Sequence, residues 1–240
     1  MCPWASRSPP RGSPTHSRSG SRDTSNGSPR GSATPPATTR SGTAERMARR
    51  TSFDEDYYRR FYGADPVHTA EKVAVLASAV HSLTEWWDLP VASVLDIGAG
   101  PGYWRDWYAA HHPSVDYVSV DVSEHACRTY GHQQRDITQW RPNRAFDLVV
   151  CHGVLHYLDA EGAESAVANI AAAARGIVYI EAPTKRDLEE IVDTDATDMD
   201  VHRRTGAWYR KRLDPHFTQI GAGLWLSRRC PLPLYELERG

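Results

Sequence analysis

Apolar residues along this chain occur in two alternating patterns, short aliphatic runs and longer stretches with helical spacing. The short runs, bounded by turn-forming residues, predict strands over residues 92–97, 116–121, 133–137, 146–151 and 177–181. Helical spacing predicts helices over residues 66–87, 101–111, 123–130 and 161–175. Because strands and helices alternate, the fold class expected is α/β, with a doubly wound, mostly parallel sheet covered by helices on both faces.

Two further features of the pattern concern packing and the end of the chain. In the first helix, the residues expected to face the sheet are Val73, Leu76, Ala77, Val80, Leu83 and Trp86. The chain closes with strand-like runs over residues 217–227 and 232–238, which predict a C-terminal antiparallel hairpin. Glycines at 221 and 223 predict a bulge or a close approach of neighbouring backbone within the hairpin.

The first strand runs directly into a glycine-rich turn, Val-Leu-Asp-Ile-Gly-Ala-Gly-Pro-Gly over residues 94–102. Glycine lets a ligand lie against the backbone, and the helix that follows offers unpaired N–H groups, so the turn predicts a nucleotide-like ligand. A dinucleotide fingerprint requires its third glycine at position 103, where this chain has Tyr103. The carboxylate of Asp96 is better placed beside an ammonium group than beside a pyrophosphate.

Over this stretch the chain resembles the class I S-adenosylmethionine-dependent methyltransferases, whose first motif is an acidic residue, an apolar residue and Gly-x-Gly-x-Gly. The resemblance extends over residues 94–181 by motif and from Phe53 to the end by architecture. It implies a seven-stranded sheet and S-adenosyl-L-methionine as cofactor, with S-adenosyl-L-homocysteine as product. It also implies in-line methyl transfer to oxygen or nitrogen of a small-molecule acceptor. The residues that match the turn motif are Asp96, Gly98, Ala99, Gly100 and Gly102.

Further cofactor contacts are expected where the next strands end. Asp121 follows Asp96 by the spacing at which a carboxylate reaches a ribose, although an Asp here also suits a helix cap; Val122 would then lie against the adenine. The resemblance implies that Asp136 takes the adenine amino group and that Ile137 packs on the ring, although Asp136 equally suits a turn.

The fourth strand ends in Cys151-His152-Gly153-Val154, where family members that methylate amino groups of nucleobases or amides usually carry Asn- or Asp-Pro-Pro-aromatic. The difference favours the small-molecule branch, and Cys151 is counted among the residues that contact the cofactor. His152 and His156 are spaced to share one face if the stretch is helical. They suit a general base, a two-ligand metal site or structural packing.

Acceptor contacts are predicted from three parts of the chain. Tyr57 and Tyr62 belong to an N-terminal helical lid, residues 51–90, but also suit ordinary helix anchors. Glu181 ends a parallel strand at the ligand-binding edge, or alternatively caps it. Residues 184–214 form a charged acceptor-side lid in which Arg203, Trp208 and Tyr209 could meet a carboxylate or an aromatic ring. The acidic residues of this segment lack the central glycine of a helix-loop-helix calcium site, and no metal is predicted.

Composition divides the 240 residues at about position 50. Residues 1–50 are rich in Ser, Pro and Arg, with few aliphatic side chains, and predict a disordered tail ahead of a methyltransferase domain over 51–240. The tail carries nine Arg against two acids, +7, which leaves −9 for the remainder of a chain whose total is −2. Contact with nucleic acid or a membrane, a transit peptide, and no function at all remain open for the tail. We expect removal of residues 1–46 to leave folding and cofactor affinity intact.

The remaining sequence features narrow the functional classes. An acidic body disfavours nucleic acid as a partner of the folded domain. The absence of a long apolar run predicts no membrane span and a cytoplasmic protein, and four scattered cysteines predict neither a disulfide framework nor a zinc site. One rival function is a non-catalytic cofactor-binding scaffold or sensor. The other is a nicotinamide-dependent oxidoreductase, which the spacing of the glycines disfavours.

Overall fold

The computed structural model of this chain describes residues 53–64 and 66–239. The predicted tail, residues 1–50, lies outside the described residues. Among the described helices, none combines the length and the apolar character needed to cross a membrane.

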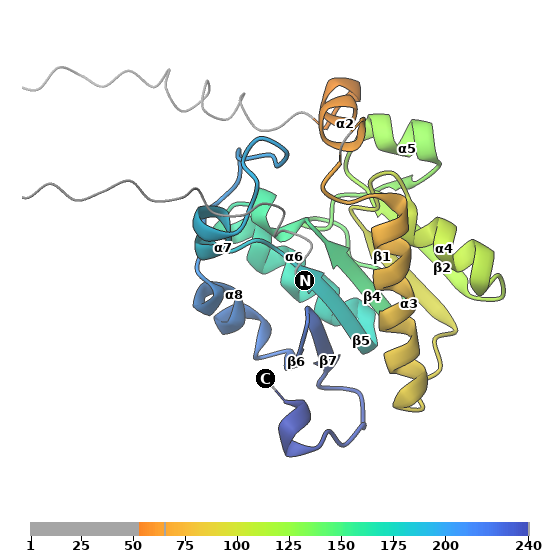
Figure 1. The fold of residues 1–240 in the computed structure, drawn as a ribbon. Helices are drawn as coiled ribbons and strands as arrows, with labels where there is room; N and C mark the ends of the chain where they lie inside the picture. The colour runs from red at the N-terminus through yellow and green to blue at the C-terminus, as the bar shows by residue number, and fades with distance from the viewer. Residues whose placement is uncertain (1–52, 65, 240) are drawn as a thin grey trace, which may run out of the picture. The chain divides into compact units, whose positions relative to one another are not determined.

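A seven-stranded sheet with the order β3-β2-β1-β4-β5-β7-β6 forms the centre of the fold (Figure 1). Every neighbouring pair from β3 to β5 is parallel, and β7 is antiparallel to both β5 and β6. The predicted fold class is therefore confirmed. The strands are β1 (Ser93–Ile97), β2 (Asp116–Asp121), β3 (Gln133–Gln134), β4 (Phe146–His152), β5 (Ala174–Glu181), β6 (Phe217–Gly221) and β7 (Leu224–Ser227).

The chain changes direction across the sheet at β1. After β1 it builds β2 and β3 on one side, and it then returns to place β4 on the other side. Ligands of doubly wound sheets bind at the carboxyl ends of the strands at such a reversal. The order of the strands therefore places the expected site at the ends of β1, β2 and β4.

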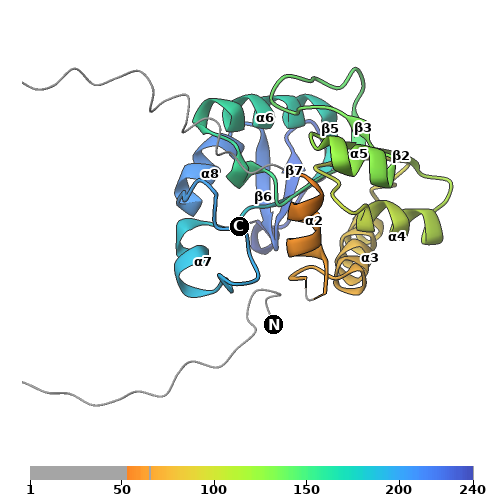
Figure 2. The same ribbon diagram turned by 90° about the horizontal axis from the view of Figure 1, so that it is seen from above.

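Helices cover both faces of the sheet. On one face, α3 (Ala70–Trp86) and α4 (Tyr103–His111) share an apolar cluster with the strands, and α6 (Ala160–Ala173) and α8 (Gly206–Leu213) share a second cluster on the other. Figure 2 shows α3 and α6 on opposite sides of the sheet. The remaining helices are α2 (Glu55–Tyr62), α5 (Glu124–Tyr130), α7 (Lys185–Glu190), and the 3-10 turns η1 (Leu155–Tyr157) and η2 (Glu236–Glu238).

The inner face of α3 differs from the prediction at its C-terminal end. Val73, Ala77 and Val80 are buried as expected, but Leu83 and Trp86 are 37% and 76% exposed. The helical period continues from Val80 to Thr84, four residues later, so Thr84 takes the buried position.

The predicted C-terminal antiparallel hairpin is present, but with other bounds. Residues 217–227 do not form one strand; they form both β6 and β7 of the hairpin. Ala222 and Gly223 have φ values of 50° and 79°, typical of a two-residue hairpin turn, and Leu224 pairs with Gly221 across them. The pairing is irregular between Gln219 and Gly221, and a Cβ atom at Gly223 would lie 2.8 Å from the Tyr179 ring, so the expected bulge and close approach both occur beside the turn.

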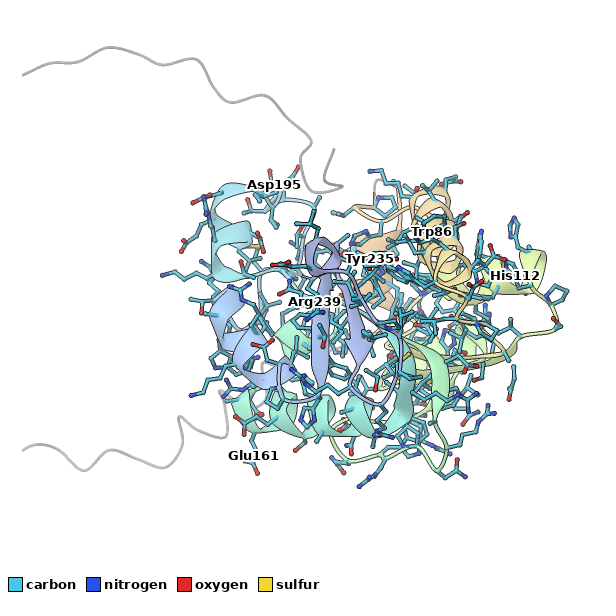
Figure 3. All side chains as sticks on the ribbon, turned by 90° about the horizontal axis from the view of Figure 1, so that it is seen from below. Trp86, His112, Glu161, Asp195, Tyr235 and Arg239 are labelled. Carbon is cyan, nitrogen blue, oxygen red and sulfur yellow. The ribbon has the colours of Figure 1, made fainter. Side chains whose placement is uncertain are left out.

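Residues 232–238 do not form the second strand of the hairpin. They pack against α3, where Leu232 and Leu234 join its apolar cluster and Trp87 Nε1 donates to Glu238 Oε1 at 3.3 Å. Trp86 and Tyr235, both exposed, lie in this part of the molecule (Figure 3). Proline has no N–H for a strand ladder, and the prolines at 231 and 233 therefore disfavour a strand here.

Candidate cofactor and acceptor site

The glycine turn joins β1 to α4 through a backbone that other residues do not readily adopt. Gly98, Gly100 and Gly102 have φ values of 67°, 56° and 85°. A Cβ atom at Gly98 would lie 2.4 Å from Val154 Cγ2, in the segment that follows β4. Glycine at this position is thus required both by the backbone conformation and by the close approach of a neighbouring chain segment.

Asp121, the last residue of β2, fixes this turn from the side. Its Oδ2 accepts from Gly100 N at 3.0 Å, and its Oδ1 accepts from Ser123 N at 2.8 Å. The cap of α5 is Ser123, whose Oγ accepts from Ala126 N, so the alternative of Asp121 as the helix cap does not describe its contacts. Asp121 instead ties the glycine turn to the start of α5 and lines the cavity beside it.

His132, which sequence reasoning missed, holds the same turn from another direction. Its Nε2 lies 2.9 Å from the carbonyl oxygen of Gly100 and its Nδ1 lies 2.9 Å from Ser119 Oγ. Because a carbonyl only accepts, Nε2 carries the proton and Nδ1 accepts from the serine hydroxyl. Burial lowers the pKa of His132, which favours this neutral form.

We expect His132→Ala to weaken cofactor binding about tenfold, because Gly100 loses a hydrogen bond to a buried side chain and the turn gains freedom. Calorimetric titration with S-adenosylmethionine measures the effect. His216→Ala is a suitable control, since His216 is exposed and far along the chain from the turn. Equal affinities of the two variants would contradict the role of His132.

Asp96 is a buried carboxylate that faces the cavity. It is 1% exposed, and its Oδ2 accepts from Tyr117 Oη at 2.9 Å. Burial raises the pKa of Asp96 to about 7, although the Tyr117 hydrogen bond and the nearby His152 act in the opposite direction. A carboxylate that is costly to ionise in an empty site is stabilised when a cation binds beside it.

Of the remaining residues predicted to contact the cofactor, only Val122 lines the cavity. Val122 is 50% exposed and lines the cavity. Asp136, Ile137 and Cys151 are not among the described residues that line it. Asp136 Oδ1 accepts from the backbone and the hydroxyl of Thr138 at 2.8 and 2.7 Å, which matches the turn alternative. Ile137 and Cys151 lie in the core, and burial raises the pKa of Cys151 to about 12. Their contact with the cofactor stays a prediction.

Helix α2 contributes an aromatic wall to the cavity. Tyr57 and Tyr62 both line it, and Tyr57 Oη lies 2.9 Å from Tyr157 Oη of η1. A Cβ atom added at Gly100 would lie 3.7 Å from Tyr62 Oη, so this hydroxyl lies beside the glycine turn. Ser123 Oγ donates to the carbonyl of Phe53, just before α2, and Figure 1 shows α2 beside α5. The N-terminal helix is therefore positioned as a cover over the glycine turn.

Two histidines and a glutamate meet on the other side of the cavity, where β4 and β5 end. His152 and Glu181 are register partners of these strands, and His152 Nε2 lies 3.3 Å from Glu181 Oε1. His68, in the loop before α3, places its Nε2 3.7 Å from the same oxygen. Sequence reasoning missed His68 because nothing in its local sequence marks it; only the fold brings it to Glu181.

The proton positions in this group follow from Trp104. Its Nε1–H donates to His152 Nδ1 at 3.2 Å, so Nδ1 bears the lone pair and the proton of neutral His152 sits on Nε2, facing Glu181. Burial lowers the pKa of His152, but the Glu181 carboxylate raises it by more, and the net shift is upward. His152 Nδ1 therefore already accepts a hydrogen bond from Trp104 and is not available to take a proton from a bound acceptor.

Comparison with known proteins agrees with this geometry. Residues 95–176 match a family model described as a methyltransferase domain. Over these residues the chain is similar to methyltransferase domains, and its sheet has the strand arrangement of the class I methyltransferase fold. No curated protein matches its sequence.

Solved structures of methyltransferases share the fold of this chain at low sequence identity. The N-methyltransferase NodS from Bradyrhizobium japonicum WM9 is 16% identical with a TM-score of 0.50, over 74% of this chain and 100% of that chain. Magnesium protoporphyrin IX methyltransferase from Synechocystis PCC 6803 is 19% identical with a TM-score of 0.50, over 76% and 97%. The plantazolicin methyltransferase BpumL is 15% identical with a TM-score of 0.51, over 61% and 63%.

His156 does not share a helix face with His152. His152 ends β4, Gly153 turns the chain with a φ of 72°, and His156 lies in η1. His156 is buried at the cavity, its Nδ1 has no hydrogen-bond partner within residues 53–64 and 66–239, and burial lowers its pKa to about 3. It is therefore a neutral imidazole at physiological pH.

The acceptor-side segment meets the cavity through different residues from those predicted. Arg203 is exposed, Tyr209 is buried in the core, and Trp208 is stacked between the guanidinium groups of Arg204 and Arg212. None of the three predicted residues is among the described residues that line the cavity. The segment contributes Ala196, Thr197 and Asp198 instead, and Pro183 lines the cavity just before the segment begins.

A metal site was not predicted, but His68, His152 and Glu181 offer ligand atoms within 4.8 Å of one another. A metal bound at His152 Nε2 would require the proton on Nδ1. Trp104 donates to Nδ1, so this hydrogen bond and a metal ion exclude each other. The observed contacts therefore favour a proton, and not a metal, between His152 and Glu181.

Proposed function

We propose that the methyltransferase transfers the sulfonium methyl of S-adenosylmethionine to oxygen or nitrogen of a small-molecule acceptor in one in-line displacement. The observation that carries this proposal is one cavity that extends from the glycine turn to the ends of β4 and β5. Cofactor residues and acceptor residues line the same space, as direct transfer between two bound molecules requires.

The cofactor has a binding group for each of its parts. Asp96 would hold the ammonium group of its methionine portion, and Asp121 would accept from the ribose hydroxyls. Asp121 already accepts two backbone N–H groups, but each carboxylate oxygen has a second lone pair. Val122 would cover the adenine, and α2 would close over the bound molecule through Tyr62.

The acceptor would bind between α2 and the histidine–glutamate group. Methyl transfer needs the acceptor atom in line with the sulfonium carbon and the loss of one proton, and it needs no covalent enzyme intermediate. Burial lowers the pKa values of His156 and His68 to about 3 and about 4, so both imidazoles are neutral and suit hydrogen bonds that orient the acceptor, while its proton passes to water. His152 suits a positioning role, because Trp104 occupies its lone pair. Small-molecule acceptors are supported by the fold shared with NodS and the protoporphyrin methyltransferase.

Asp121→Ala tests the cofactor assignment. Each charge-assisted hydrogen bond contributes about 1.5–3 kcal/mol, so we expect S-adenosylmethionine to bind roughly ten- to a few hundredfold more weakly. Calorimetric titration of the protein with S-adenosylmethionine and separately with NAD measures it. Asp116→Ala is the matched control, because Asp116 is an exposed carboxylate at the other end of the same strand.

The same titrations discriminate the rival functions. Binding of NAD, or of neither molecule, would contradict the methyltransferase site. A scaffold or sensor would bind S-adenosylmethionine but form no S-adenosylhomocysteine with any acceptor offered. Product formation in a single turnover therefore separates an enzyme from a binding protein.

A further inference from the structure

We propose that the acceptor of this site is an amine, which binds as its ammonium form against Glu181 and the aromatic rings of Tyr57 and Tyr157. This inference rests on the proposed function and names the substrate class of the same cavity.

The first argument is the sign of the charges around the cavity. Its charged side chains, among the described residues, are the four acids Asp96, Asp121, Glu181 and Asp198, and no Lys or Arg is among them. Two of these acids flank the glycine turn, where the cofactor is expected. Glu181 stands at the opposite side, at the end of β5, where it meets the acceptor. A carboxylate- or phosphate-bearing acceptor would face like charge without a basic partner.

The second argument is the state of the Glu181 carboxylate. Its Oε2 accepts from Tyr179 Oη at 2.7 Å, whereas its buried Oε1 faces His152 Nε2 at 3.3 Å without meeting hydrogen-bond geometry. Burial raises the pKa of Glu181, but His152, Tyr179 and His68 together lower it to about 2, so it is ionised. A buried anionic oxygen whose neighbouring N–H is poorly aligned is stabilised further by a well-aligned N–H donor that carries positive charge.

The third argument is that aromatic rings of α2 and η1 line the same cavity as Glu181. Phe53, Tyr57 and Tyr157 pack edge to face with ring centroids 5.0 Å apart for Phe53 with each tyrosine. Burial raises the pKa of Tyr57 to about 12, so its ring stays a neutral phenol. The faces of electron-rich rings attract cations, and they offer an anion no such interaction.

The atoms and electrons of the chemical step balance. The ammonium loses one proton to water, and the nitrogen regains its lone pair. That lone pair forms the N–C bond to the methyl group while the C–S bond breaks with its electron pair going to sulfur. The products are S-adenosylhomocysteine, the methylated ammonium and the proton released to water.

Three probes with one phenol ring test the charge preference. Tyramine carries an ammonium, 4-ethylphenol carries no charge, and 3-(4-hydroxyphenyl)propionate carries a carboxylate. Each is titrated by calorimetry into the protein saturated with S-adenosylhomocysteine. We expect tyramine to bind at least about tenfold more tightly than 4-ethylphenol and the propionate to bind more weakly than both.

Glu181→Gln is the corresponding variant. It should remove the preference for tyramine and leave the affinity for S-adenosylhomocysteine within about twofold, because Glu181 lies away from the glycine turn. Glu189→Gln, which removes an exposed carboxylate paired with Lys185, should leave both affinities unchanged. Binding of S-adenosylhomocysteine also shows that each variant is folded. The titrations of the three probes into the unaltered protein test the preference for an amine without any variant.

Equal binding of the three probes, tighter binding of the propionate, or no binding of tyramine at about 10 mM would overturn the amine assignment. Each of these results, with normal binding of S-adenosylhomocysteine, leaves the proposed methyltransferase site standing. Failure of S-adenosylhomocysteine itself to bind would overturn the proposed function and this inference together.

Discussion

Replacing Asp96 with Asn should weaken S-adenosylmethionine binding by about 100-fold and at the same time stabilise the unliganded protein. The variant keeps the shape of the side chain and can still accept from Tyr117, but it loses the charge that would hold the cofactor ammonium. Calorimetric titration and thermal unfolding of the same samples measure the two effects.

The pH dependence of stability follows from the raised pKa of Asp96. Its value rises from 3.8 to about 7 on folding, so the folded state favours the protonated carboxyl, and this stability is lost as pH rises through 7. We therefore expect Asp96→Asn to match the unaltered protein near pH 4 and to exceed it by roughly 1–3 kcal/mol at pH 8.

Cofactor affinity should have the opposite pH dependence. Because a bound cation favours the ionised carboxylate, the Kd for S-adenosylmethionine should fall about tenfold from pH 6 to pH 8. The Asn variant should lose this dependence. His152→Gln serves as the control, since protonation of His152 would also repel a cation. If the slope disappeared in that variant but persisted in Asp96→Asn, the assignment to Asp96 would be wrong.

Gly98→Ala should have the largest effect on the fold of the turn. The new Cβ would need a left-handed backbone and would overlap Val154 Cγ2, so we expect a loss of about 3–5 kcal/mol in unfolding free energy and no measurable cofactor binding. Denaturant unfolding and calorimetry measure both consequences.

Two variants separate the overlap from the backbone strain. Gly131→Ala meets a similar positive φ with nothing within 4 Å, so it should cost only about 1–2 kcal/mol and leave cofactor binding intact. Adding Val154→Ala to Gly98→Ala should recover the part of the loss due to overlap. A double variant no more stable than Gly98→Ala alone would argue against the close approach of these segments.

The sheet and the cofactor turn could be predicted from the sequence because their signals are local. The run of residues 94–102 carries its own strand, carboxylate and glycines, and each of Asp96 and Asp121 lies at a strand end whose position follows from the hydrophobic pattern. Parallel strands then bring these ends to one edge of the sheet, where the structure places both at one cavity.

The acceptor side could not be predicted in this way, because its geometry comes from contacts between distant segments. His68 reaches Glu181 across more than a hundred residues, and nothing near His68 in the sequence indicates that contact. Arg203 and Trp208 could bind a carboxylate or an aromatic ring by their side-chain chemistry. In the structure, however, Arg203 is exposed to solvent, and the guanidinium groups of Arg204 and Arg212 cover the Trp208 ring. The hairpin was misplaced for a related reason, since one glycine pattern suits both a bulge and a turn.

The two walls of the acceptor site are attached very differently, and this sets an order of events in the catalytic cycle. The Arg204 guanidinium donates to the carbonyls of Leu155 and Leu158, and His202 N donates to the carbonyl of His156, so one wall is fastened to η1 and the residue after it by hydrogen bonds to backbone carbonyls. Helix α2 is held over the glycine turn mainly by aromatic side chains. We expect α2 to open for exchange, so that the cofactor enters first and leaves last. Steady-state kinetics would then show S-adenosylhomocysteine competing with S-adenosylmethionine but not with the acceptor.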